Sequence, residues 1–221
     1  MQRQSLEQSS NVRLTERDAD VVRLVCEQGV ADARDLSSFM ARCRGRAGIG
    51  ERTRNGVIAR LVRVGLLESD RFFAARPALV FPTRLGAQWV QWEGTWRRPP
   101  LALLRHEMTA TAVRVAAYPT QLGWTYQAER AVLAQAIDCG QHRPDGIAVL
   151  AGIRTAVEVQ LSVTDVKRTT SVIDSHLEMF DRVHYWAVPA AASVVNRSIE
   201  SSLPVSDRSR VQVTLLEGLE R

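Results

Sequence analysis

Residues 142–162, HRPDGIAVLAGIRTAVEVQLS, contain the pattern that decides the fold of the second half of the chain. Two apolar runs, 146–150 and 154–161, lie on either side of a short Ala-Gly turn and predict two strands that would pair as a hairpin. Alternate residues of a strand share a face, so Glu158 and Gln160 point to one side while the neighbouring valines point to the other. The stretch therefore predicts a polar pocket on one face of a sheet.

Asp145 directly follows Pro144 and opens the first of these strands. A hairpin would bring its carboxylate to the same pocket as Glu158. Carboxylate oxygens suit Mg²⁺ or Mn²⁺, and such an ion can polarise a phosphate and lower the pKa of a bound water. Two other interpretations stay open. Asp145 could be only a turn residue, and Glu158 could pair with Arg154 or Arg168, because a buried carboxylate is costly without a partner.

Helices and strands alternate on both sides of the hairpin, which predicts an α/β domain with a mixed sheet and helices on its faces. The expected helices are 101–117, 165–179 and 191–201, and the further expected strands are 124–129, 183–188 and 211–216.

The N-terminal half has a different pattern, namely helices followed by a hairpin. A helix is expected over 15–28, because Thr15 suits its N-terminal cap and Gly29, just after it, suits its C-terminal end. Further elements are expected in this order: a helix over 32–42, a Gly-rich turn over 45–50, a helix over 51–64, strands over 66–68 and 79–81, and a short helix capped by Thr83.

Positive charge is concentrated in one part of this half. The net charge of the chain is +5, and residues 42–76 alone hold nine arginines against Glu51, Glu68 and Asp70. A localised basic patch is typical of a surface that binds phosphate groups. The alternative is a solvated basic face.

The stretches ARLVRVGLLES (59–69) and FPTRLGAQWV (81–90) resemble the end of the recognition helix, the wing and the closing helix of a winged helix-turn-helix, and the resemblance covers residues 12–92. It implies that the helix beginning at Glu51 enters the major groove of double-stranded DNA. The resemblance places Arg52, Thr53, Arg54 and Asn55 nearest the bases, Arg63 on the same helix, and Arg44, Arg46, Arg60, Arg71 and Arg76 at phosphates. A winged-helix module that binds protein is the alternative.

The segment EGTWRRPP, residues 93–100, contains two prolines and reads as a linker. The predicted domains are therefore 12–92 and 101–221.

The residues around the carboxylate pair resemble the core of the PD-(D/E)XK nuclease superfamily over residues 101–190. The resemblance implies that Asp145 and Glu158 are metal ligands. Gln160 stands where that superfamily most often has lysine, and Lys167, on the following helix, is the one lysine available. A further ligand would come from Glu107 or Glu129. Glu129 is preferred because it is expected to end a strand.

Both halves together, through LTERDADVVRLV, RLVRVGLLES, RHEMTATAVRVA, YQAER, RPDGIAVL and AVEVQLS, resemble the replication-relaxation protein family of plasmids and mobile elements. The resemblance implies an α+β chain with an N-terminal winged helix-turn-helix and an α/β PD-(D/E)XK-like domain. It also implies a role on double-stranded DNA in replication, relaxation or mobilisation. If the second domain is active, it would hydrolyse phosphodiester bonds with Mg²⁺ or Mn²⁺, and Gln160 would orient the water.

Two alternatives remain beside that hypothesis. The first is a non-catalytic regulator whose second domain forms a homodimer or recruits a relaxase, and the second is a protein-binding adaptor. The N-terminus is polar, so no secretory signal is expected, and the lack of a long apolar run argues against a membrane span. The odd number of cysteines, three, suits a reducing compartment. A cytoplasmic location is therefore expected.

Overall fold

The computed structural model describes residues 13–72, 77–140 and 142–219. It is an α+β structure whose contacts divide the chain into two units that meet between Ala116 and Ala117. Among the described residues, no helix combines the length and apolarity needed to cross a membrane.

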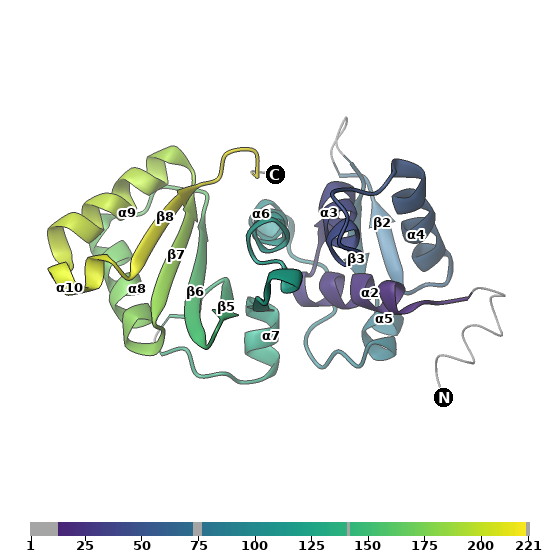
Figure 1. The fold of residues 1–221 in the computed structure, drawn as a ribbon, viewed down its shortest axis with the longest axis horizontal. Helices are drawn as coiled ribbons and strands as arrows, with labels where there is room; N and C mark the ends of the chain where they lie inside the picture. The colour runs from purple at the N-terminus through teal and green to yellow at the C-terminus, as the bar shows by residue number, and fades with distance from the viewer. Residues whose placement is uncertain (1–12, 73–76, 141, 220–221) are drawn as a thin grey trace. The chain divides into compact units, whose positions relative to one another are not determined.

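The first unit combines helices with a small antiparallel sheet (Figure 1, purple to teal). Its strands are ordered β1-β3-β2, with β1 at Ala31–Asp32, β2 at Leu67–Asp70 and β3 at Leu79–Pro82. Its helices are α2 (Glu16–Gln28), α3 (Ala33–Arg42), α4 (Glu51–Arg63), α5 (Arg84–Trp89) and α6 (Leu101–Ala117).

Local sequence signals set the helix ends of this unit. The Thr15 side chain accepts a hydrogen bond from the Asp18 N–H, and the Asp18 side chain accepts one from the Thr15 N–H, which completes a capping box. Gly29 ends α2 in the left-handed region at φ 78°. Asp32 caps α3 and Thr83 caps α5. The predicted helix starts are thus confirmed.

One helix belongs to a different unit from the one expected. Helix α6 packs inside the first unit, because its Leu104 and Met108 share a buried cluster with Val30 and Phe81. The hydroxyl of Thr111 donates to the carbonyl of Val30 at 2.8 Å. The division between units therefore falls after Ala116, and not at the proline-containing segment 93–100.

The second unit contains a mixed sheet, as predicted (Figure 1, green to yellow). Strands β4, β5 and β6 pair antiparallel, and β6, β7 and β8 pair parallel. The strands are β4 (Thr125–Ala128), β5 (Gly146–Leu150), β6 (Ile153–Gln160), β7 (Arg182–Ala187) and β8 (Val211–Leu215). The helical segments are η1 (Thr120–Leu122), α7 (Glu129–Ala134), α8 (Val166–Met179), α9 (Pro189–Ser202) and α10 (Val205–Arg208).

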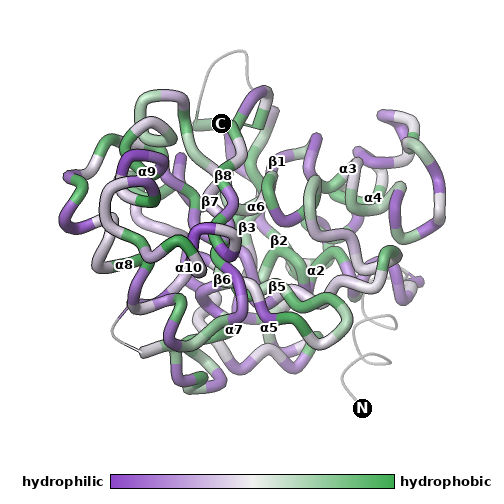
Figure 2. Tube along the Cα trace, turned by 60° about the vertical axis from the view of Figure 1, so that its left-hand side comes forward, coloured by the Kyte–Doolittle hydropathy of each residue, from purple (hydrophilic) through white to green (hydrophobic). Residues whose placement is uncertain are grey.

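The core of this unit forms between the sheet and helices α8 and α9. Ile173 of α8 and Val195 of α9 are fully buried in one cluster with Ile147, Ala156 and Tyr185 of the strands. Hydrophilic and hydrophobic residues alternate along helices of both units, as the changing colours of α4 and α9 show in Figure 2. Such a pattern is expected of helices that bury one face only.

The prediction that Glu129 ends a strand is wrong. Strand β4 ends at Ala128, and Glu129 is the first residue of α7. The change of direction follows the sequence, because ERAVLA has good helix formers and an acidic residue in its first turn.

Candidate functional site

Three acidic residues lie at neighbouring positions across the second sheet. Gly146 pairs with Val157 in the antiparallel register, so the preceding residue, Asp145, lies opposite Glu158. The N–H of Glu129 donates to the carbonyl of Asp145 at 2.9 Å. Glu129, Asp145 and Glu158 thus form a row across adjacent segments, which we call the carboxylate row.

Asp145 is bound to the strand that carries Glu158. Its Oδ2 accepts a hydrogen bond from the N–H of Val159 at 2.7 Å. A residue that only made a turn would not be held across the hairpin in this way. The bond fixes the Asp145 carboxylate next to that of Glu158.

Glu158 lies in an environment that disfavours its charged form. Its side chain is 19% exposed. Burial raises the pKa of Glu158 well above its usual value, and the negative charges of Asp145 and Glu129 raise it further. The carboxylates of Asp145 and Glu129 thus lie close enough to Glu158 to disfavour its charged form.

The partner of Glu158 is His176 of helix α8, and not Arg154 or Arg168. The Nε2 atom of His176 lies 2.7 Å from Oε1 of Glu158, and the imidazole is fully buried. Burial, and then the nearby His142, lower the pKa of His176 to about 4. Arg154 instead covers the ring of Phe180.

The amide of Gln160 points to the beginning of α8. Its Nε2 donates to the Thr164 hydroxyl at 2.6 Å, and that hydroxyl lies 2.8 Å from the hydroxyl of Thr169. Gln160 shares the Glu158 face of β6, as the strand period predicts. Its amide is oriented by threonines.

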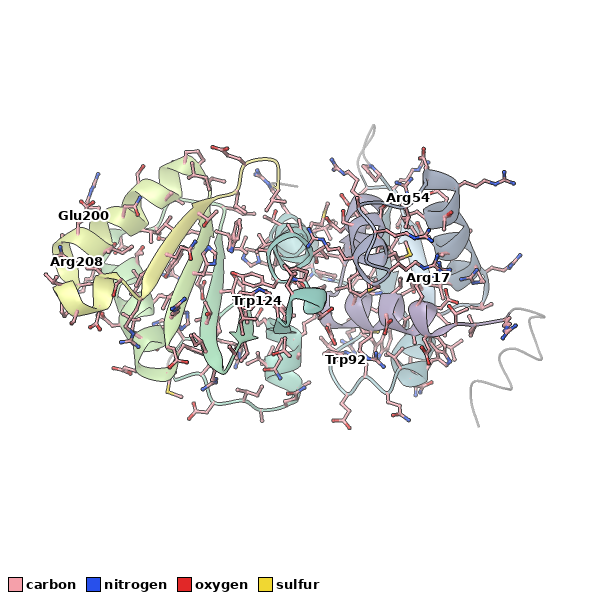
Figure 3. The ribbon with its side chains drawn as sticks, in the orientation of Figure 1. Arg17, Arg54, Trp92, Trp124, Glu200 and Arg208 are labelled. Atoms are coloured by element: carbon pink, nitrogen blue, oxygen red, sulfur yellow. The ribbon has the colours of Figure 1, made fainter. Side chains whose placement is uncertain are left out.

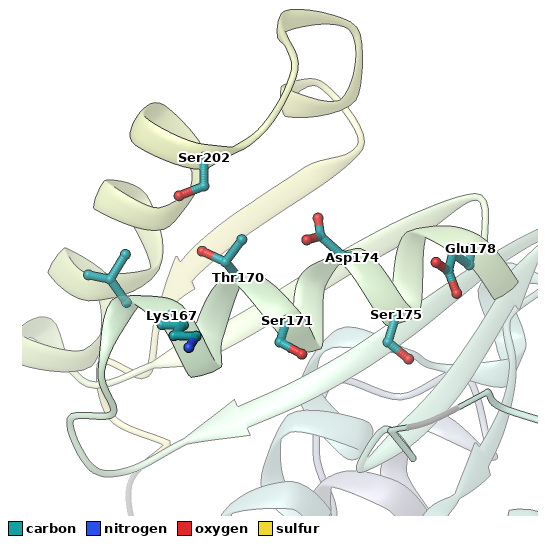
Figure 4. Close-up of a pocket in the computed structure, with 8 residues that line it drawn as sticks. Lys167, Thr170, Ser171, Asp174, Ser175, Glu178 and Ser202 are labelled. Carbon is teal, nitrogen blue, oxygen red and sulfur yellow. The ribbon is translucent and has the colours of Figure 1, made fainter.

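Lys167 is not placed with the carboxylate row. It is exposed and lines a cavity of about 640 Å³ with Asp174 and Glu178 of α8 and Ser202 of α9 (Figure 4). Lys167 precedes His176 by two and a half helical turns, so it lies on the opposite side of α8 from the residue that contacts β6. The buried residues of α8 are Thr169, Ile173, Ser175 and His176, and Ser175 also lines the cavity, whereas none of the three carboxylates does. The lysine and the carboxylates therefore do not share a pocket.

The donors of the row have the right chemistry for a hard cation, because carboxylate oxygens are the ligands that Mg²⁺ prefers. In the described part of the chain, however, no group of three or more His, Cys, Asp or Glu side chains is arranged to hold a metal ion. Asp145 and Glu158 offer two donors, and Glu129 lies 3.9 Å from the guanidinium of Arg143.

A second set of predicted residues lies on and around helix α4 of the first unit. Arg52, Thr53, Asn55 and Arg63 are exposed. Arg54 is 16% exposed and bonds to Glu51 at 2.8 Å and to Asn55 at 3.0 Å. The helix therefore presents a polar, positively charged face.

The remaining arginines of this set differ in their surroundings. Arg44, Arg46 and Arg71 are exposed. Arg60 is bound to the buried carboxylate of Asp18. Arg76 lies outside the described residues.

His176 and Tyr185 are the residues that sequence reasoning missed. Tyr185 pairs in register with Glu158, and its pKa is raised by burial and then by Glu158 and Asp145. A signal for His176 was present, since it lies at helical spacing with Thr169 and Ile173 on the buried stripe of α8.

Comparisons of the chain with protein-family models, with curated proteins and with solved structures found no match.

Proposed function

We propose that the chain binds double-stranded DNA through helix α4 and the exposed arginines near it. The observation that carries this proposal is the exposed face of α4, where Arg52, Thr53, Asn55 and Arg63 lie together. Among the described residues, α4 has two arginines in ion pairs, Arg54 with Glu51 and Arg60 with Asp18, whereas Arg52 and Arg63 are in none. The positive charge of this surface is thus left for an anionic partner.

The order of elements in the first unit supports a winged helix-turn-helix. Helices α2, α3 and α4 are followed by the antiparallel pair β2 and β3 and by α5. In such domains the third helix lies in the major groove, where Arg can bond bidentately to guanine and Asn to adenine. Arg44, Arg46 and Arg71 would then bind phosphates, which position the protein without reading sequence.

DNA affinity measured at several salt concentrations tests this proposal. We expect the logarithm of the binding constant to fall steeply and linearly with the logarithm of salt concentration. Arg52→Ala should weaken binding, whereas Arg23→Ala, a change of an exposed arginine paired with Asp20 on α2, should not. Binding that is absent, or equal in all three proteins, would reject the proposal.

We further propose that the second unit hydrolyses phosphodiester bonds in the manner of PD-(D/E)XK nucleases. The carboxylate row carries this proposal. Asp145 and Glu158 would hold Mg²⁺ or Mn²⁺, with Glu129 beside them, and the ion would polarise the phosphate and lower the pKa of a water. Gln160 would orient that water.

The alternative is a non-catalytic regulator, and three features of the site favour it. Lys167 faces away from the sheet, the Gln160 amide is bound by Thr164, and Glu158 is bound by His176. In that case the second unit would form a homodimer or bind a relaxase or another protein of a mobile element. Both alternatives place the chain on DNA in the cytoplasm.

A plasmid-cleavage assay with Mg²⁺ or Mn²⁺ separates the two. Asp145→Asn and Glu158→Gln keep the shape of each side chain and remove its charge. Glu178→Gln, on the outer side of α8, is the matched control. Cleavage by the wild type and the control, but by neither of the other variants, would support the nuclease. DNA binding without cleavage would support the regulator.

A further inference from the structure

A cavity of about 510 Å³ in the first unit is lined by helix α4 and by the β2–β3 pair. That volume is in the range of pockets that hold small molecules. The α4 residues at the cavity recur at helical spacing and so form one stripe: Glu51, Arg54, Asn55, Ile58, Ala59 and Val62. The stripe is polar at the beginning of the helix and apolar farther along.

The apolar part of the cavity is continuous with the core of the unit. Ile58 and Val62 are half-buried and pack against the buried residues of that core. From the strands, the buried Val80 of β3 lines the same cavity, together with Pro77 and Ala78, which precede β3. A ligand with an apolar body would bury it against these side chains, which stabilises the complex.

Arg54 brings a positive charge to the polar part of the cavity. It lies near the beginning of α4 (Figure 3), and its side chain is only 16% exposed. Its Nη2 lies 2.8 Å from Oε1 of Glu51, and its Nε donates to Oδ1 of Asn55 at 3.0 Å. The Glu51 side chain is 77% exposed. A ligand carboxylate can therefore replace Glu51 at Arg54 and leave the Glu51 carboxylate in water.

Arg71 adds a second positive charge. It follows strand β2, is exposed, and lines the same cavity. In the part of the chain that the structure describes, its guanidinium is in no ion pair, and the neighbouring Asp70 is bound to Arg98 at 3.1 Å. The described lining thus has two guanidinium groups and one carboxylate, that of Glu51, which favours an anionic ligand.

We infer that this cavity binds a small molecule with an apolar body and a carboxylate head. The planar fork of a guanidinium matches a carboxylate, and Arg54 and Arg71 supply two such forks. Ile58, Val62 and Val80 take the apolar body. A backbone phosphate of DNA has no such body, so the apolar lining favours a small molecule over DNA as the occupant.

The ligand would also regulate DNA binding, a part of the inference that rests on the proposed function. Asn55 lines the cavity and lies on the face of α4 that is proposed to meet the bases. A carboxylate bound beside it adds negative charge to that face and competes for Arg54, which holds the Asn55 amide. DNA affinity should therefore fall when the cavity is filled, and DNA should weaken ligand binding by the same factor.

A titration with 2-naphthoate, followed by NMR, tests the site without DNA. We expect it to shift the Arg54 Nε–H signal and the backbone amide signals of Ile58 and Val62. Two compounds separate its parts: 2-naphthamide has the same shape without the charge, and acetate has the head without the body. The amide should bind about tenfold more weakly, the usual loss for a charge-assisted hydrogen bond. Acetate should leave the signals unchanged.

Two variants change the cavity itself. Ala59 is exposed and lines the cavity, so Ala59→Phe fills it from a surface position and should abolish binding. Its control is Ala102→Phe, at an exposed position of α6. Arg71→Gln should weaken 2-naphthoate binding about tenfold. Its control, Arg63→Gln, removes an exposed arginine of α4 that does not line the cavity.

The outcomes are distinct. Binding by the wild type and both controls, with loss in Ala59→Phe, supports the site. The site is rejected if 2-naphthoate shifts none of these signals, or if Ala59→Phe binds it like the wild type. Equal shifts with acetate would also reject it and would favour a phosphate of DNA as the occupant. If 2-naphthoate binds but a DNA duplex does not, the site stands and the DNA-binding proposal fails. If both bind and 2-naphthoate leaves the duplex affinity unchanged, the regulatory part is overturned.

Discussion

Nε2 of His176 lies 2.7 Å from Oε1 of Glu158, and this contact joins helix α8 to strand β6. Burial and the charges of Asp145 and Glu129 raise the pKa of Glu158, while burial and then His142 lower the pKa of His176 to about 4. Both surroundings disfavour charge, so the contact is consistent with a hydrogen bond between a neutral imidazole and a neutral carboxyl group. The contact stabilises the fold and also orients a residue of the carboxylate row.

We expect His176→Ala to lower the free energy of unfolding by about 2 kcal/mol, because it leaves a largely buried carboxyl group without its hydrogen-bond partner. Glu158→Gln should cost less, since the new amide can still form a hydrogen bond with His176, through its oxygen or its nitrogen. Urea unfolding at pH 7 measures both. Equal losses in the two variants would contradict the role of His176 as the hydrogen-bond partner of Glu158.

Asp145 gives a similar contrast. Its Oδ2 accepts from the N–H of Val159, and Asp145→Asn keeps an oxygen in that place, whereas Asp145→Ala removes it. We expect Asp145→Ala to be less stable than Asp145→Asn by about 1 kcal/mol, the usual value of one hydrogen bond. Urea unfolding of the two variants measures the difference. Equal stability would mean that the bond contributes nothing to folding.

His184 predicts a dependence of stability on pH. Its Nδ1 lies 2.8 Å from the hydroxyl of Tyr118 and its Nε2 lies 2.8 Å from that of Thr214, and burial lowers its pKa to about 4. In the unfolded chain His184 therefore binds a proton below about pH 6.5, whereas in the folded chain it binds one only below about pH 4. The stabilisation is present above pH 6.5 and is lost as the pH falls towards 4, by on the order of 3 kcal/mol.

Unfolding free energies of wild type and His184→Gln over this range check that prediction. The wild type should lose more stability than the variant as the pH falls. Parallel curves would show that His184 does not carry the effect.

Local signals were sufficient to predict most helices and strands. Thr15 and Gly29 cap the two ends of α2 as expected. The alternation around Glu158 predicted the correct face of β6, because the strand period depends only on neighbouring residues. The unit to which α6 belongs could not be predicted in this way. It depends on contacts such as the one between Thr111 and Val30, which are far apart in the sequence.

The candidate site shows the same division. The pairing of Asp145 with the strand of Glu158 follows from a hairpin, which is local. The His176 contact requires the position of α8 over the sheet, and the Asp18 contact of Arg60 requires the packing of α4 on α2. Side-chain partners of this kind depend on the tertiary structure. The sequence therefore predicted a phosphate contact for Arg60 and gave no sign of its ion pair with Asp18.

Arg60 and Arg63 should differ in their effects on stability, although both lie in the last turn of α4. Arg60→Ala removes the arginine partner of the buried Asp18, and we expect a loss of about 1–3 kcal/mol, limited by the Thr15 bonds that remain. Arg63→Ala changes an exposed side chain and should stay within about 0.5 kcal/mol of the wild type. Thermal or urea unfolding compares them, and equal effects would contradict the structural role of Arg60.

Arg98 should affect DNA binding more than stability. It bonds to Glu68 and Asp70 of β2, and its guanidinium lies 4.6 Å from the ring centroid of Phe81. These side chains are partly exposed, so Arg98→Ala should cost less than about 1 kcal/mol in unfolding free energy. The change would leave two carboxylates without a counter-charge beside the proposed DNA surface, and affinity should fall most at low salt, where screening is weak. Neutralising both acids, with Glu68→Gln and Asp70→Asn, should restore affinity in the Arg98→Ala protein. If affinity stays low, the repulsion argument fails and Arg98 itself contacts DNA.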